Sequence, residues 1–277
     1  MRQKKLAVLI ILIGFLLLSY PFFSNYIFEK SAASTVRSYQ NKINHIEQKN
    51  RENLLCDARK YNQDLWKTRA ELTDPFQKKQ DQKQKISYQK ILNIDDSGII
   101  GYIRIPCIFV ELPIYHGTSE EVLRQGVGHL NASSFPIGGK NTHSVLTGHT
   151  GLGSARLFTD LIQMKKGDKF FIQVLDQNLA YKVEQIKIVK PENTKDLQII
   201  YGKDYVTLVT CTPYGVNDHR LLVRGIRTTS EKKQEKRLAQ SRGSKWLGVY
   251  KKAVLAGILV VLMITFIMKM IRRIKGE

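Results

Sequence analysis

The sequence predicts a mainly β protein, a closed β-barrel with short helices that is preceded by an N-terminal helical segment and flanked by two transmembrane helices. Three observations lead to this prediction. Short β-rich runs alternate with turn residues over residues 97–229, a charged segment without Pro or Gly covers most of residues 29–72, and a long apolar run lies near each end. Many short strands with few helices are typical of barrels, and roughly 20 apolar residues are enough to cross a bilayer.

The first apolar run is unbroken from Leu6 to Leu18 and continues with many aromatic residues to Phe28. A cleaved signal peptide is the alternative, but no cleavage site of small residues follows the run closely. We therefore expect an uncleaved transmembrane signal anchor in residues 1–28. Basic residues precede the run and favour a cytoplasmic N-terminus, so the chain after the anchor is expected to be extracellular.

The charged segment after the anchor predicts an extracellular helical segment over residues 29–72. Pro75 ends it, because proline lacks a backbone donor and disfavours helical angles at Asp74. Residues 77–85 consist of Gln, Lys and Asp, so residues 73–96 are expected to form a mobile loop and linker. The apolar residues of the helical segment recur at steps of three and four, as on one helix face: Val36, Tyr39, Ile43 and Ile46, then Leu54, Ala58, Tyr61 and Leu65.

Residues 97–229 are expected to form the barrel domain. One helix is predicted at 154–164, where Leu157, Phe158, Leu161 and Ile162 form an apolar stripe. The predicted strands, each bounded by turn residues, are 99–105, 109–112, 144–147, 169–175, 180–189, 205–211 and 221–227.

The C-terminal part predicts a basic juxtamembrane linker at 230–252 and a second transmembrane helix with a cytoplasmic tail at 253–277. Basic residues flank the second apolar run on both sides, so its direction follows from that of the first span. The formal net charge of +20 would suit a nucleic-acid partner, but much of the excess lies beside the membrane, which argues against one. The linker either faces anionic lipid headgroups or wall polymers, or is simply solvated, and the sequence leaves both readings open.

Three cysteines in an extracellular chain leave at least one thiol unpaired. No Cys/His cluster has zinc spacing and no acidic cluster has calcium-loop spacing, so no metal or other cofactor is expected. Cys56 lies in the polar helix and is interpreted as structural or incidental, and Cys107 as a small buried residue. Cys211 ends a predicted strand beside a loop, where a side chain is presented to a cleft, which makes it the candidate nucleophile; a buried core cysteine is the alternative.

Two further residues suit chemistry at Cys211. His149 stands between glycines that let the backbone turn, although spacing alone does not distinguish it from His143. Arg220 opens the strand that follows Cys211. An antiparallel return would bring its guanidinium beside the thiol, where it could stabilise an oxyanion or merely be solvated.

Three pieces of sequence together resemble the signature of sortases: Thr147-Gly148-His149, Thr207-Leu-Val-Thr-Cys211, and Arg220 nine positions after the cysteine. The resemblance covers residues 97–228 and implies a sortase-type barrel. It further implies that Cys211 is the nucleophile of a cysteine transpeptidase, His149 its proton partner and Arg220 the oxyanion stabiliser.

The C-terminal span and the tripeptide Asp74-Pro75-Phe76 resemble class C sortases, the pilus-assembling subgroup. This implies that the tripeptide anchors a lid over the active site, with Asp74 near Arg220 and Phe76 near Cys211. Asp218 stands where a small neutral residue is expected, which bears on the charge around Arg220.

The resemblance implies cleavage of a Leu-Pro-x-Thr-Gly-like sorting signal through a thioester, and joining of pilin subunits by Lys isopeptide bonds at the cell membrane. One alternative is a wall-anchoring enzyme that uses a peptidoglycan amine. Another is a membrane-held scaffold without enzymatic activity. The resemblance does not identify which pilin is the substrate or whether the lid is closed at rest.

Overall fold

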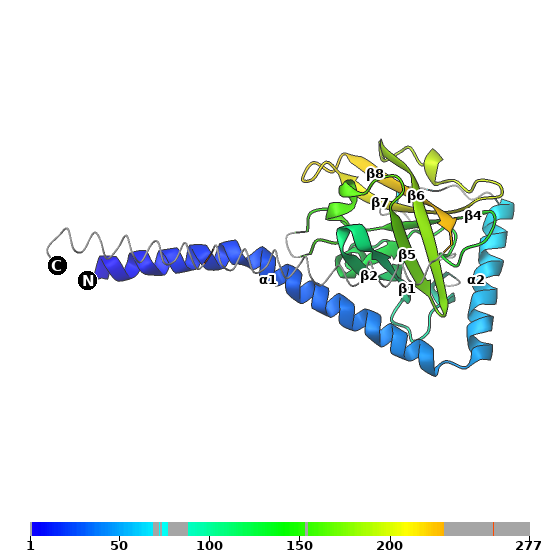
Figure 1. Cartoon of the computed structure of the whole chain (residues 1–277), viewed down its shortest axis with the longest axis horizontal. Coiled ribbons are helices and arrows are strands. Elements are labelled where there is room, and N and C mark those ends of the chain that lie inside the picture. Colours follow the sequence, from blue (N-terminus) through cyan, green and yellow to red (C-terminus); the bar gives the residue numbers. More distant parts are fainter. Residues whose placement is uncertain are drawn as a thin grey trace. The chain divides into compact units, whose positions relative to one another are not determined.

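A closed barrel forms the centre of the part of the chain that this computed structural model describes, residues 2–68, 72, 74–76, 88–152, 155–229 and 257. Within this part, eight strands are hydrogen-bonded in the order β1-β2-β3-β4-β7-β8-β6-β5 (Figure 1). The mainly β closed barrel predicted from the sequence is thus confirmed. The strands are β1 Ile99–Ile105, β2 Val110–His116, β3 Val127–His129, β4 Thr142–Thr147, β5 Lys169–Val174, β6 Gln177–Val189, β7 Asp204–Thr212 and β8 His219–Thr228.

Strand β7 is central to the site because it lies between β4, which runs parallel to it, and β8, which is antiparallel. Its residues alternate between two apolar clusters, as a pleated strand requires. Val206 and Leu208 belong to the main core, whereas Val209 belongs to a second, smaller cluster. Cys211 therefore shares the face of Val209. The buried members of this second cluster are Leu72, Leu130, Val145, Leu197, Val209 and Leu222.

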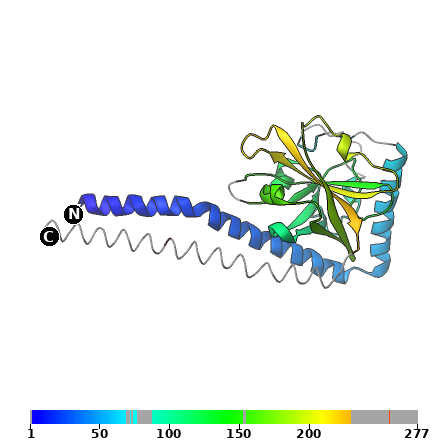
Figure 2. The same ribbon diagram turned by 45° about the horizontal axis from the view of Figure 1, so that its top comes forward.

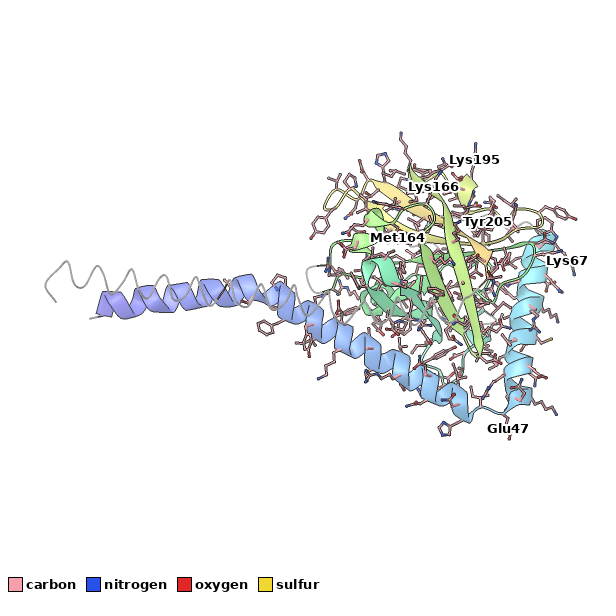
Figure 3. All side chains as sticks on the ribbon, viewed as in Figure 1. Glu47, Lys67, Met164, Lys166, Lys195 and Tyr205 are labelled. Carbon is pink, nitrogen blue, oxygen red and sulfur yellow. The ribbon has the colours of Figure 1, made fainter. Side chains whose placement is uncertain are left out.

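Two helices, α1 (Arg2–His45) and α2 (Gln48–Thr68), precede the barrel and meet at a corner marked by Glu47 (Figure 3). The single helical segment expected over 29–72 is therefore divided. The end of α1 is capped by Arg51, which donates to the carbonyl oxygens of Ile43 at 2.8 Å and Ile46 at 3.1 Å. These bonds satisfy carbonyl groups that have no partner at the end of a helix.

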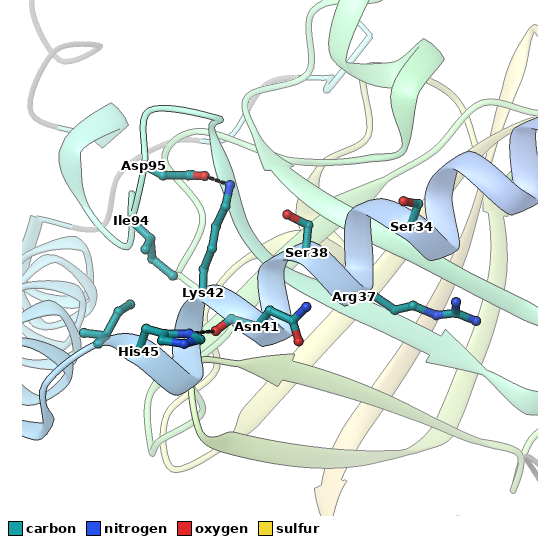
Figure 4. Close-up of a pocket in the computed structure, with 9 residues that line it drawn as sticks. Ser34, Arg37, Ser38, Asn41, Lys42, His45, Ile94 and Asp95 are labelled. Atoms are coloured by element: carbon teal, nitrogen blue, oxygen red, sulfur yellow. Dashed lines mark hydrogen bonds and ion pairs between the residues drawn. The ribbon is translucent and has the colours of Figure 1, made fainter.

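The C-terminal half of α1 and the whole of α2 run along the barrel (Figures 1 and 2), and polar contacts dock both helices there. On α1, Lys42 forms an ion pair with Asp95, just before β1 (Figure 4). On α2, the buried side chain of Asn62 donates to the carbonyl of Phe135 at 3.1 Å and accepts from its N–H at 2.7 Å. An ion pair thus ties α1 to the segment before β1, and two hydrogen bonds tie α2 to the backbone of Phe135.

Tyr39 of α1 joins two strands of the barrel, so its removal gives a test of helix docking. Its hydroxyl donates to Ile100 at 2.9 Å and accepts from the N–H of Leu175 at 3.1 Å. We expect Tyr39→Phe to lower the free energy of unfolding by about 1–3 kcal/mol, because two buried backbone groups lose their partner. Thermal denaturation of the full-length protein measures the change. Tyr201→Phe, at a tyrosine that is 79% exposed, should leave stability unchanged, and an equal loss in both variants would contradict the docking role.

The short helices differ from the sequence prediction. The helix expected at 154–164 is wrong: Leu157 has a left-handed φ of 38°, and only a 3-10 helix follows it, while residues 153–154 lie outside the described residues. Ile162 of the expected stripe is exposed. The short helices are η1 Pro106–Ile108, α4 Glu120–Gln125, η2 Thr159–Gln163 and η3 Lys195–Leu197.

The membrane segments stay predictions. Among the described residues, none of the helices combines the length and apolar character needed to span a bilayer. The predicted linker at 230–252 lies outside the described residues, as do the second span at 253–277, apart from Gly257, and the polar stretch at 77–85. The domain boundaries drawn from the sequence likewise remain predictions.

Candidate active site

Cys211 is half-buried near the end of β7, between His149 and Arg220. On one side, the antiparallel register pairs Cys211 with Arg220, as an antiparallel return predicts. On the other side, β4 pairs Thr147 with Val209. The same register continues beyond β4, because the N–H of Gly148 donates to Val209 at 3.0 Å. His149 and Cys211 each follow the Thr147–Val209 pair by two residues, so the backbones of Cys211, His149 and Arg220 lie at one end of the barrel.

Hydrogen bonds and close packing hold the loop after β4 against the end of β7. Thr210 donates to the carbonyl of Gly148 at 2.7 Å, and its hydroxyl lies 2.5 Å from that of Thr150. A Cβ atom at Gly148 would stand 2.7 Å from the Phe158 ring. Only glycine fits there, since such contacts essentially never occur, and this close packing positions the backbone that carries His149.

The Arg220 guanidinium is held by Asp74 in a bidentate pair. Nε donates to Oδ1 at 2.9 Å and Nη2 donates to Oδ2 at 2.8 Å. The two side chains are only 11% and 2% exposed. Nη1 donates to the carbonyls of Asn217 at 3.0 Å and His219 at 3.1 Å. In this arrangement Asp74 accepts from Nε and from one N–H of Nη2 on one edge of the guanidinium.

Phe76 covers the same end of the barrel. The Arg220 guanidinium carbon lies 4.8 Å from the centre of the Phe76 ring, and the ring centres of Phe76 and His149 are 6.0 Å apart. Pro75 is buried, and Leu72 belongs to the second cluster beside Val209. The described residues from 72 to 76 therefore pack against the second cluster, Arg220 and His149, at the end of the barrel that carries Cys211.

Comparisons with known proteins agree with this geometry. A family model described as "Sortase domain" matches residues 103–228. The structure is similar to sortase C1 from Streptococcus agalactiae, with 44% identity and a TM-score of 0.67 over 72% of this chain and 100% of that one. The chain belongs to the sortase family.

Two further sortases resemble this one. The structure of Clostridium perfringens sortase C with the C-terminal cell wall sorting motif is 46% identical, with a TM-score of 0.62 over 72% of this chain and 100% of that chain. Sortase A of Bacillus anthracis is 27% identical over 220 residues, which cover 79% of this chain and 91% of that protein. Sortases are cysteine transpeptidases, so this sortase is an enzyme, and the non-enzymatic scaffold is excluded.

Burial has the largest effect on the pKa values of the Cys211 thiol and the His149 imidazole. Burial raises the pKa of the Cys211 thiol, while the Arg220 charge lowers it and the Asp74 charge raises it. Burial lowers the pKa of His149, against the opposing charge of Glu120. Near neutral pH the thiol and the imidazole are therefore both mainly neutral in this structure.

His143 is held in the core by hydrogen bonds from both sides of its ring. His143, which spacing alone could not separate from His149, is fully buried, with ring nitrogens 2.8 Å from the carbonyl of Gln198 and 2.7 Å from the hydroxyl of Thr207. Burial lowers the pKa of His143 to about 4. It lies at the other end of β4, so it is a core residue.

All three thiols of the sortase are free. Cys107 is exposed, which corrects its interpretation as a small buried residue: η1 follows β1 directly, and this turn breaks the strand alternation and presents the side chain to solvent. Cys56 is exposed on α2. Asp218 lies 2.9 Å from Nδ1 of its neighbour His219, so its carboxylate pairs there rather than with Arg220.

Glu120 is a site residue that the sequence reasoning missed. Its Oε2 lies 3.4 Å from Nε2 of His149. The signal that could have located it is the run Ser119-Glu120-Glu121, an N-cap residue followed by acidic residues, which is typical of a helix start. Within the described ranges, no cluster of three or more His, Cys, Asp or Glu could hold a metal ion.

Proposed function

We propose that this sortase is a pilin-polymerising enzyme of the class C type, covered by a lid at rest. The observation that carries the proposal is the bidentate pair between Asp74 and Arg220 beside Cys211. Two of the sortases similar in structure are sortases C. By pairing with Arg220, Asp74 would keep the oxyanion donors occupied until a substrate arrives, as a lid that is closed at rest requires.

In the proposed reaction, the Cys211 thiol passes its proton to His149, and the sulfur attacks the carbonyl carbon of a Thr–Gly bond in a Leu-Pro-x-Thr-Gly-like sorting signal. Arg220, once released by Asp74, donates hydrogen bonds to the oxyanion. The C–N bond breaks as His149 gives its proton to the leaving amine, and a thioester remains on Cys211. A Lys amine of another pilin then attacks the thioester. His149 takes the proton of that amine, an isopeptide bond forms, and the sulfur leaves as a thiolate that is reprotonated.

A lid at Asp74, Pro75 and Phe76 would serve this reaction by keeping water from the thioester. Water and amine compete for the acyl group, and a covered site favours the nucleophile that is bound and oriented. Phe76, which contacts both His149 and Arg220, would leave together with Asp74 while the sorting signal enters, and it would cover the site again once the thioester has formed.

The proposed location is the cell membrane, with two spans at residues 1–28 and 253–277 and the catalytic domain, residues 97–229, outside the cell. Sorting signals and pilins are extracellular in this account, and an anchored enzyme meets them at the membrane surface. The helical segment at 29–72 would then stand between the membrane and the barrel.

The choice of amine separates the two enzymatic hypotheses. We expect the full-length enzyme, given a sorting-signal protein and equal concentrations of a pilin and a wall-precursor amine, to form mainly pilin–pilin adducts joined through Lys. Gel ladders and mass spectrometry of the cross-linked peptides measure the two products. Preferential transfer to the wall-precursor amine would support the wall-anchoring alternative instead. The Asp74–Arg220 pair and the similarity to sortases C favour the pilin amine.

A further inference from the structure

The imidazole of His149 has a carboxylate neighbour, Glu120, that lies outside the three pieces of sequence that resemble the sortase signature. Nε2 of His149 is buried and forms no hydrogen bond within the described residues, yet it lies 3.4 Å from Oε2 of Glu120. We propose that Glu120 is a positioning residue of the transpeptidation, which holds the His149 ring through Nε2 and favours its protonated form. This inference rests on the proposed role of His149 as proton partner of Cys211.

The fold brings Glu120 to this place. Ser119 caps α4, its side chain accepting from the N–H of Val122, and Glu120 is the first residue of the helix. The helix leads into β3, whose Gly128 pairs with Thr147 at the end of β4. The first turn of α4 therefore lies beside the loop that carries His149. Glu120 reaches the ring from the side of β3, whereas Cys211 lies on the side of β7.

Arg124 orients the carboxylate. Its Nε donates to Oε1 of Glu120 at 3.1 Å, one helical turn along α4, so Oε2 remains for His149. A carboxylate opposite Nε2 favours the tautomer with hydrogen on that nitrogen, as in the carboxylate–histidine pairs of other enzymes. Nδ1 is then the nitrogen that exchanges a proton with the thiol and with the amine.

The charges around His149 show what Glu120 contributes. From α4 the ring faces Glu120 and Arg124, from the lid the neutral ring of Phe76, and from β7 and β8 Cys211 and an Arg220 whose charge is matched by Asp74. Burial and Arg124 disfavour the imidazolium. The Glu120 carboxylate is the charge in these surroundings that favours it when the thiol is neutral.

This matters because the reactive state is the minor one. The proton must leave the Cys211 sulfur and bind His149, which creates a thiolate and an imidazolium from two neutral groups. The fraction in that state falls about tenfold each time the pKa of His149 decreases by one. Glu120 therefore raises the reactive fraction without contacting the substrate.

The test compares Glu120→Gln with the matched control Glu121→Gln, an exposed acid at the next position of the same helix. The pKa of His149 is measured by NMR titration of full-length protein with labelled histidine, in a Cys211→Ala background, and its signal is assigned by its loss in His149→Asn. The pH profile of kcat/KM with a sorting-signal peptide is measured in protein that retains Cys211. Circular dichroism checks that each variant folds.

We expect Glu120→Gln to lower the pKa of His149, to move the acidic limb of the kcat/KM profile to lower pH, and to reduce the plateau by about tenfold if that pKa falls by one. Glu120→Asp, which keeps the charge on a shorter side chain, should lower the pKa less, and Glu121→Gln should leave it unchanged. An unchanged pKa and acidic limb in Glu120→Gln would overturn the proposal, even if the rate fell. The NMR titration needs no turnover, so it separates this failure from a failure of the proposed function.

Discussion

Replacing Cys211 by alanine is expected to abolish both cleavage of the sorting signal and formation of pilin ladders. The sulfur is the atom that would carry the acyl group, and no neighbouring group can replace it, because Arg220 is a cation and His149 would serve as the acid and base. Loss of a covalent nucleophile lowers rates by factors on the order of 10⁴ or more. The side chain lies half-buried at a strand end, so the fold should tolerate the smaller residue.

The chain offers two matched controls for this prediction. Cys56→Ala and Cys107→Ala remove the other two thiols, both of them exposed. Each should retain full activity, measured as release of the leaving peptide and as the ladder of products. Ladders formed by Cys211→Ala at the rate of the unaltered enzyme would contradict the assignment of the nucleophile.

Replacing Asp74 by alanine is expected to accelerate modification of Cys211 by a small thiol reagent roughly ten- to hundredfold. Hydrogen bonds between charged groups contribute about 1.5–3 kcal/mol each to the state that contains them. Without Asp74, the closed arrangement buries the Arg220 charge without its ion-pair partner, which disfavours this arrangement further. The lid therefore opens more often, and the thiol is reached more often.

This rate is measured in protein that lacks Cys56 and Cys107, so that Cys211 is the single thiol. Asp218→Ala is the control, because Asp218 is also an acid near Arg220 in the sequence but pairs with His219. Phe76→Ala should accelerate modification as well, since it removes the ring that contacts Arg220 and His149. Equal rates in Asp74→Ala and in the unaltered protein, or an equal gain in Asp218→Ala, would contradict the proposed lid.

Much of the barrel could be predicted because its strands are long and β-rich. All seven predicted strands overlap observed ones, and 99–105 agrees with β1 at both ends. Strand β3 has only three residues, with Gly128 at its centre, so it lacks any alternation that could reveal it. Its pairing with β2 and β4 is a tertiary property that local sequence does not carry.

The helices were harder because their ends depend on contacts made elsewhere. Neither Gly nor Pro marks the corner between α1 and α2; there, Arg51 caps carbonyls of the preceding helix. The apolar stripe at 157–162 suggested an α-helix, but Leu157 takes a left-handed φ and packs its side chain in the core instead. Leu157, Phe158 and Leu161 are apolar for the reason inferred, namely burial, whereas Ile162 is exposed and the backbone conformation differs.

In the site, too, strand order could be predicted from the sequence, whereas tertiary contacts could not. The antiparallel return that sets Arg220 opposite Cys211 followed from strand order. The choice between His149 and His143 did not follow from strand order, because His143 lies near the start of β4 and His149 just after its end, and only the register with β7 separates them. Glu120 could not be predicted as a neighbour of His149. The helix α4 was not expected, and the two side chains come together only through the tertiary fold.

Direct detection of the acyl-enzyme tests the central claim that Cys211, His149 and Arg220 form one site in which sulfur carries the acyl group. The Asp74→Ala variant of the full-length protein is mixed with a sorting-signal peptide without any amine, quenched in acid, digested and analysed by mass spectrometry. The account predicts a thioester adduct on Cys211 alone, which a Lys-bearing pilin then removes. Turnover of the peptide with no adduct on Cys211, or an adduct on Cys56 or Cys107 instead, would contradict it.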